Sequence, residues 1–374
     1  MNRREFLKCV TVLGASITLG KTSAYAKWFT NRKRNGFPQG MLLIDAHAHP
    51  DQFYYVGPRE GPQWDAWCAQ LCDESSTLGK IMELGMHASS FAAIGDSKNG
   101  PYTFGDQVMN QVNRVIDLEK QRLIRILRRH KDMPHGGPPK GLIPGAILSL
   151  EGASPLGSDE DTVFENLGIL YESGMRMMTL MHYLDNQFGQ AMRSDREKTD
   201  GDGLSDVGKK VIEQMMKLGV VVDVAHAHYP TLRDIVEIAV ANGVPLIDSH
   251  TSLSPCEGFC GGRLRTWEEM EMITSTGGVV CTWPLKWVRN DGSGRLTLYD
   301  WAEENHIMKE RLGSQHIALG TDGGGTLPEM VEGYASISDL PKLVEAMDEV
   351  GFKRSEIAAY MGGNLLHVIK QCIG

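Results

Sequence analysis

Short apolar segments recur along the chain and are separated by segments whose hydrophobic positions follow a helical period. The apolar segments predict strands, and their nearly continuous hydrophobicity favours strands covered on both faces, as in a parallel sheet. There are eight such segments: Met41–His49, Met86–Gly95, Gly145–Ala153, Met175–Tyr183, Gly219–Ala227, Val244–Thr251, Gly277–Pro284 and His316–Gly323.

Two of the segments between these strands are the clearest amphipathic helices. One begins at Asp106, a favourable N-cap, and its apolar positions from Val108 to Leu127 form a single stripe. The other spans Leu204–Lys217 and ends at Gly219, because glycine readily adopts the left-handed conformation that closes a helix.

Alternation of strands and helices over eight units predicts an α/β protein, a (β/α)8 TIM-like barrel. The alternative is an open, doubly wound sheet. Such a sheet carries a glycine-rich phosphate loop after its first strand, whereas residues 45–49 read Asp-Ala-His-Ala-His. The barrel is therefore the predicted fold.

Composition and charge narrow the class of function. The chain has 374 residues, of which 41% are hydrophobic and 23% charged, the balance of a globular protein with a large core. Its formal net charge is −9. Nucleic-acid binding needs a cationic surface, so the acidic balance argues against it.

The N-terminus carries the pattern of an export signal. Arg3 and Arg4 precede an apolar stretch from Cys9 to Gly20, and Ala24–Ala26 matches a small-x-small cleavage site. That stretch is shorter than the ~20 residues that span a bilayer, although a retained anchor is the alternative. We expect residues 1–26 to be a twin-arginine signal peptide and residues 27–374 a single barrel domain, exported to the periplasm by the twin-arginine translocase.

Chemically active side chains stand at the ends of six predicted strands, where barrel enzymes build their sites. They are His47, His49, Glu151, His182, His226, His250 and Asp322. Independent core histidines have no reason to collect at one end of successive strands. These residues are therefore predicted to converge on one mouth of the barrel.

The spacing of the histidines predicts two metal ions. His47 and His49 are two residues apart and so point to the same face of a strand. His226 and His250 end adjacent strands about 4.8 Å apart and can reach a second ion, although His228 is an alternative to His226.

Glu151 is predicted to bridge the ions with its two oxygens. Imidazole and carboxylate suit zinc, though cobalt, manganese or iron also fit. Ions about 3.5–4 Å apart share a water and lower its pKa to about 7, which yields the hydroxide of a hydrolase. Asp322 is expected to ligate one ion and to carry the proton of the attacking water to the leaving amine.

The role of His182 and three further residues complete the predicted site. His182 is expected to polarise the substrate oxygen, and Arg263 either clamps a substrate carboxylate or forms a surface ion pair. Asp45 and Asp248 each precede a proposed ligand by two residues. They either hold imidazole N–H groups or are simply buried and paired.

These motifs resemble the membrane (renal-type) dipeptidases, the M19 peptidases of the amidohydrolase superfamily, over nearly all of residues 27–374. The matching segments are Ile44–His47, Leu148–Gly152, Met178–His182, Gly203–Ser205, Leu218–His226, Asp248–Thr251, Gly277–Val280, Leu319–Asp322 and Met361–Leu366. The resemblance implies a binuclear zinc barrel of the amidohydrolase type, often a homodimer, that cleaves dipeptides and often tolerates a D residue at the C-terminal position. By motif position it assigns His226 and His250 to the second metal, His182 and Arg263 to the substrate, Glu151 to the bridge and Asp322 to proton transfer.

Two departures from the family pattern bear on specificity. The family usually has Asp where this chain has His49, and an aromatic residue where it has Gly323. Other amidohydrolase activities therefore remain as alternatives: N-acyl amino acid deacylation, lactone opening or nuclease chemistry of the TatD type. A non-catalytic periplasmic protein that binds metal or peptide is the alternative from a different class.

Overall fold

Eight parallel strands form the centre of the protein, and each lies within one of the predicted apolar segments. The computed structural model describes residues 37, 40–55, 61–62, 76–135, 143–193, 197–255, 264–289, 291–325, 327 and 329–373. In spatial order the strands are β1 (Ile44–Asp45), β2 (Ala88–Ile94), β6 (Gly145–Glu151), β7 (Met177–Thr179), β8 (Val221–Asp223), β9 (Ile247–Thr251), β10 (Val279–Thr282) and β13 (Ile317–Leu319). Consecutive strands pair in parallel, so the predicted (β/α)8 barrel is confirmed and the doubly wound sheet is wrong.

The barrel closes between its first and last strands, just beyond their carboxyl ends. Asp322 N donates to His47 O at 2.8 Å, and His49 N donates to Gly323 O at 2.8 Å. These bonds join two segments that lie far apart in the sequence. They also fix three of the predicted site residues against one another before any side-chain contact is considered.

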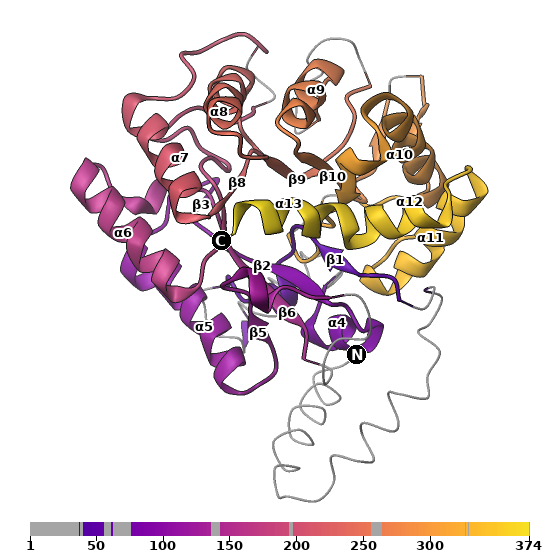
Figure 1. Ribbon diagram of the computed structural model, residues 1–374, viewed down its shortest axis with the longest axis horizontal. Helices are drawn as coiled ribbons and strands as arrows, with labels where there is room; N and C mark the ends of the chain where they lie inside the picture. Colours follow the sequence, from indigo (N-terminus) through magenta and orange to yellow (C-terminus); the bar gives the residue numbers. More distant parts are fainter. Residues whose placement is uncertain are drawn as a thin grey trace, which may run out of the picture.

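Helices surround the barrel, as Figure 1 shows in the view onto its amino-terminal end. Ser205 caps α7 by accepting a hydrogen bond from Gly208 N, and Gly219 closes it with φ 76°, so the predicted helix and its stop signal are confirmed. The helices are α4 (Leu78–Leu84), α5 (Met109–Lys120), α6 (Glu160–Ser173), α7 (Asp206–Leu218), α8 (Tyr229–Asn242), α9 (Trp267–Ser275), α10 (Leu298–Leu312), α11 (Leu340–Glu349), α12 (Arg354–Ala358) and α13 (Asn364–Cys372).

The helix predicted from Asp106 to Leu127 is wrong at both ends. A π-helical turn at Phe104–Val108 precedes α5, so Asp106 lies inside the first turn instead of capping it. The chain reverses at Arg122, whose φ is 61°, and Arg125–Ile126 forms the short strand β5 beside β6. The apolar stripe continued because Ile126 of β5 and the following Leu127 are also buried.

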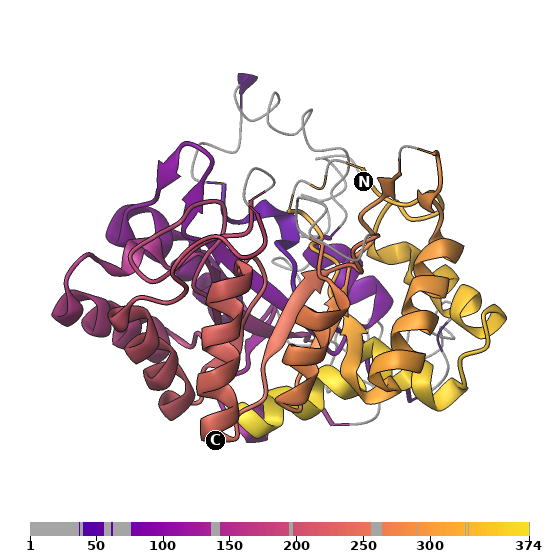
Figure 2. The same ribbon diagram turned by 90° about the horizontal axis from the view of Figure 1, so that it is seen from above.

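Helix α13 covers the amino-terminal end of the barrel, crossing the strands in Figure 1 and lying below them in Figure 2. Its Leu365 and Ile369 pack in one buried cluster with barrel residues such as Ile44, Ile147 and Val279. The barrel is therefore a filled core with one end closed by a helix. The predicted site residues lie at the opposite end, where the strands terminate.

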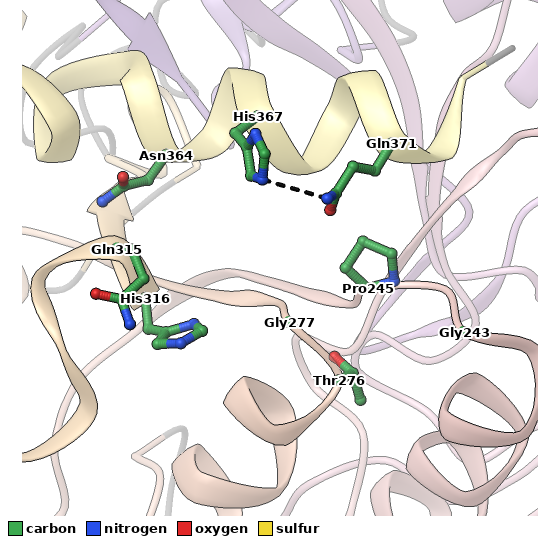
Figure 3. A pocket seen from close by; sticks show the side chains of 9 residues that line it. All are labelled: Gly243, Pro245, Thr276, Gly277, Gln315, His316, Asn364, His367 and Gln371. Carbon is green, nitrogen blue, oxygen red and sulfur yellow. Dashed lines mark hydrogen bonds between the residues drawn. The ribbon is translucent and has the colours of Figure 1, made fainter.

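A hollow beside α13 lies at this covered end (Figure 3). His367 and Gln371 of α13 line one side, and residues that precede β9, β10 and β13 line the other. None of the predicted site residues lines it. Among the described residues, each helix is too short or too polar to cross a lipid bilayer.

Candidate metal centre

Seven predicted site residues meet at the carboxyl-terminal mouth of the barrel. Each is buried, with no more than 6% of its surface exposed. Overlapping groups of them could hold a metal ion, because their ligand atoms lie within 4.8 Å of one another. The seven are His47, His49, Glu151, His182, His226, His250 and Asp322, whereas Arg263 lies outside the described residues.

His47 and His49 form the first pair of potential ligands. Their Nε2 atoms lie 3.3 Å apart. Glu151 Oε2 is 3.5 Å from Nε2 of His47 and 3.4 Å from Nε2 of His49. Asp322 Oδ1 lies 3.6 Å from His49 Nε2, so two imidazoles and two carboxylates face one point.

His226 and His250 form the second pair, with 3.1 Å between their Nε2 atoms. The other oxygen of Glu151, Oε1, lies 2.7 Å from Nε2 of His226 and 3.4 Å from Nε2 of His250. His226, and not its alternative His228, is thus the residue that meets Glu151. One carboxylate divides its two oxygens between the two histidine pairs.

The spacing and protonation of these donors fit a bound cation. A tetrahedral ion with bonds of about 2.0–2.1 Å holds its donor atoms about 3.3–3.4 Å apart, close to the separations within both pairs. Nδ1 of His49 lies 2.7 Å from the carbonyl oxygen of Ala92 and must carry the proton, because a carbonyl only accepts. Its Nε2 lone pair is therefore turned toward the cluster.

The charges of the cluster shift the pKa values of its members. Burial disfavours a charged ring at His47, but the carboxylates of Glu151 and Asp322 outweigh burial and raise the pKa of His47 to about 9. Burial likewise opposes ionisation of Glu151, yet the imidazoles of His182, His47 and His226 hold the pKa of Glu151 well below its usual value. Ion binding at this site must therefore displace a proton from His47.

Asp45 and Asp248, which each precede a candidate ligand by two residues, are buried and paired. Of the two predicted alternatives, this is the second, in which they do not hold imidazole N–H groups. Asp45 accepts hydrogen bonds from Thr321 N at 2.8 Å and Thr321 Oγ1 at 2.6 Å, and burial raises the pKa of Asp45 to about 6. Asp248 accepts from Arg265 Nε at 2.7 Å. A third acid, Asp223, accepts from Ser249 N at 3.0 Å, and burial raises its pKa to about 6.

Several residues of the site have unusual backbone conformations, which set the direction of their side chains. His226 and Asp322 adopt left-handed φ values of 64° and 50°. Such conformations cost of order 1–3 kcal/mol for residues other than glycine and are typical of functional sites. Gly152 follows Glu151 with φ 89°, and a Cβ there would lie 3.0 Å from the Cβ of His182, so glycine permits the close approach of the two strand ends.

Sequence reasoning missed Asp96, the first residue of the short strand β3 (Asp96–Ser97). Its Oδ1 lies 2.8 Å from His182 Nδ1, while His182 Nε2 lies 3.6 Å from Glu151 Oε2. Asp96 stands one residue beyond the predicted end of the second strand. The rule that located the other acids at strand ends would have found it with a slightly longer segment.

Two aromatic residues against the histidines were also missed. The Tyr54 ring lies 4.9 Å from that of His49, and its hydroxyl donates to Gly324 O at 3.0 Å. The Trp283 ring, just after β10, lies 5.4 Å from that of His250. These rings restrict the rotation of one ligand in each pair.

The chain matches a known family by sequence. The family model of membrane dipeptidases (peptidase family M19) matches residues 106–373. An uncharacterised dipeptidase from Schizosaccharomyces pombe is 32% identical over 214 residues, which cover 56% of this chain and 50% of that protein. The chain spans about half the length of the curated relatives it matches.

Solved structures share the fold. A metallopeptidase from Rhodobacter sphaeroides, liganded with a phosphinate mimic of the dipeptide L-Ala-D-Ala, has a TM-score of 0.72 at 16% identity and covers 89% of this chain and 99% of its own. A dipeptidase of family M19 has a TM-score of 0.72 at 17% identity, with coverages of 90% and 100%. At these identities the likeness is one of fold.

Proposed function

Because the chain belongs to the membrane dipeptidase family, peptidase family M19, we propose that it hydrolyses the amide bond of short dipeptides with the help of two divalent metal ions. The observation that supports the proposal is the position of the Glu151 carboxylate, whose two oxygens face different histidine pairs. One oxygen lies 3.4 Å from His49 and the other 2.7 Å from His226. That is the arrangement that a carboxylate bridge between two ions requires.

The proposed ligands are His47, His49 and Asp322 for one ion and His226 and His250 for the other, with Glu151 shared. The donors are imidazole nitrogens and carboxylate oxygens, which favour zinc. When bound, such ions polarise a substrate carbonyl and lower the pKa of water to about 7.

Asp322 and His182 are the proposed proton-transferring residues. Asp322 accepts the proton of the attacking water and passes it to the leaving amine. His182 donates from Nε2 to the substrate oxygen, where negative charge develops. Asp96 Oδ1 lies 2.8 Å from the other ring nitrogen of His182, Nδ1.

The proposed substrate is a dipeptide that tolerates a D residue at its C-terminal position. The family membership supports it, as does the solved relative of the same fold that was liganded with a mimic of L-Ala-D-Ala. Arg263 is the proposed partner of the substrate carboxylate, because its planar fork matches a carboxylate. It lies outside the described residues.

Metal analysis and a substrate panel test the proposal. Purified protein is expected to hold about two ions per chain and to cleave L-Ala-D-Ala. Asp322→Asn should lower kcat/KM at least about 100-fold, the usual scale for loss of a general base. Asp117→Asn, on an exposed face of α5, is the matched control and should not change it. Activity confined to N-acyl amino acids or lactones would contradict the dipeptidase assignment.

We also propose that the protein acts in the periplasm after twin-arginine export. The support is the sequence of residues 1–26, with Arg3 and Arg4 before an apolar stretch. Cell fractionation should find the wild-type protein in the periplasm and an Arg3→Lys, Arg4→Lys variant in the cytoplasm. Equal export of both forms would contradict the proposed route.

A further inference from the structure

A single buried arginine connects the elements that carry the second histidine pair. Arg265 is 1% exposed and lies just before α9. Its Nε donates to Asp248 Oδ2 at 2.7 Å, and its Nη1 donates to Glu269 Oε1 at 3.0 Å. Two carboxylates therefore flank the buried charge and hold the guanidinium in one orientation.

The same guanidinium donates hydrogen bonds to the turn that contains His226. Nη2 donates to Val224 O at 2.6 Å, and Nη1 donates to Ala227 O at 2.8 Å. Those carbonyls stand on either side of His226, which has the left-handed φ of 64°. Ala227 N also donates to Val224 O at 3.0 Å, so the turn is closed on itself and clamped from outside.

The contact with Asp248 connects Arg265 to the strand that carries His250, the other histidine of the pair. Asp248 lies on β9, two residues before His250. The main chain of Arg265 is fixed as well, because its N donates to Ser252 O at 2.9 Å and its O accepts from Ser254 N at 2.7 Å. One planar fork thus joins the turn after β8 to the strand β9.

We infer that Arg265 is a positioning residue that holds His226 and His250 at the separation needed to bind one metal ion. The inference rests on the proposed metal centre but does not depend on the substrate. Arg265 touches neither ligand ring in this network, and acts through the backbone of one histidine and the strand of the other. Lysine cannot replace it, because a single ammonium group lacks the fixed fork of donors.

The test compares metal binding in variants of two buried arginines. Arg176 is the matched control: it is 6% exposed, and it donates to the carbonyl oxygens of Arg128, Tyr171 and Met175 at the other end of the barrel. Zinc affinity is measured by chelator competition, and ligand geometry by visible absorption after cobalt substitution. Arg265→Met is expected to weaken one of the two ions about 10–100-fold, the scale seen when supports of metal ligands are removed.

The remaining outcomes separate positioning from general stability. Arg265→Lys retains a charge beside Asp248, and should fold yet still bind one ion more weakly and with an altered cobalt spectrum. Arg176→Met should lower the melting temperature while binding both ions as the wild type does. The inference is overturned if Arg265→Lys and Arg265→Met bind both ions with wild-type affinity, or if Arg176→Met weakens binding equally. Dipeptide hydrolysis is assayed separately on the wild type, and its absence contradicts the proposed function without changing this comparison.

Discussion

Ser249 links the two histidine pairs through its hydroxyl group. Its Oγ lies 3.3 Å from His47 Nδ1 and 2.9 Å from His250 Nδ1. A neutral histidine that ligates through Nε2 carries its proton on Nδ1, so both rings must donate there. A hydroxyl oxygen has two lone pairs and can accept both bonds. One buried side chain thus fixes the tautomer of one ligand in each pair.

Replacing Ser249 with alanine is therefore expected to weaken both ions, each by about 10–100-fold, because two buried N–H groups lose an acceptor. Zinc titration against a chelator measures the change. Ser90→Ala is the control, since Ser90 is equally buried in the barrel but its hydroxyl meets that of Ser149 at 2.8 Å. Unchanged affinity in Ser249→Ala, or an equal loss in Ser90→Ala, would contradict this role.

At the residue scale, the side chains that meet at the candidate metal centre could be predicted. The neighbouring Ser249 and Arg265 could not. His47, Glu151 and Asp322 stand at strand ends, and parallel strands in a barrel must bring their ends to one mouth. The role of Arg265 depends on which carbonyls lie near it after folding. No local pattern marks a buried arginine that contacts residues 17 to 41 positions away.

At the scale of elements, strands were located better than the limits of helices. Buried parallel strands have a distinctive composition, so all eight fell within their predicted segments. The end of α5 was missed because no glycine marks it, and the reversal occurs at Arg122 with φ 61°. Ile126 is buried in β5, and its position in the sequence happens to fit the helical period, so the predicted helix was extended to include it.

At the scale of the whole molecule, the charges of the mouth couple metal binding to stability. Burial raises the pKa of Asp45 and Asp223 from 3.8 to about 6. Their protonated carboxyls therefore stabilise the fold at low pH, and this contribution is lost as pH rises from 3.8 through 6. Above that pH their contribution is constant. The pKa of Glu151 is lowered, so its contribution is also constant there. His47 is the cluster residue whose raised pKa leaves it titrating between pH 6.5 and 9.

Metal-free protein is therefore expected to lose stability from pH 6.5 to 9, while the loaded protein does not. Despite burial, Glu151 and Asp322 raise the pKa of His47 to about 9, so its proton stabilises the fold below pH 6.5 and is lost through pH 9. The shift corresponds to a free energy of order 3 kcal/mol. Ions stabilise the native state by binding it, and they bind more tightly as the proton leaves. Melting temperatures with zinc and with chelator should diverge over this range. A constant difference, or the same slope in metal-free His47→Asn, would contradict the coupling.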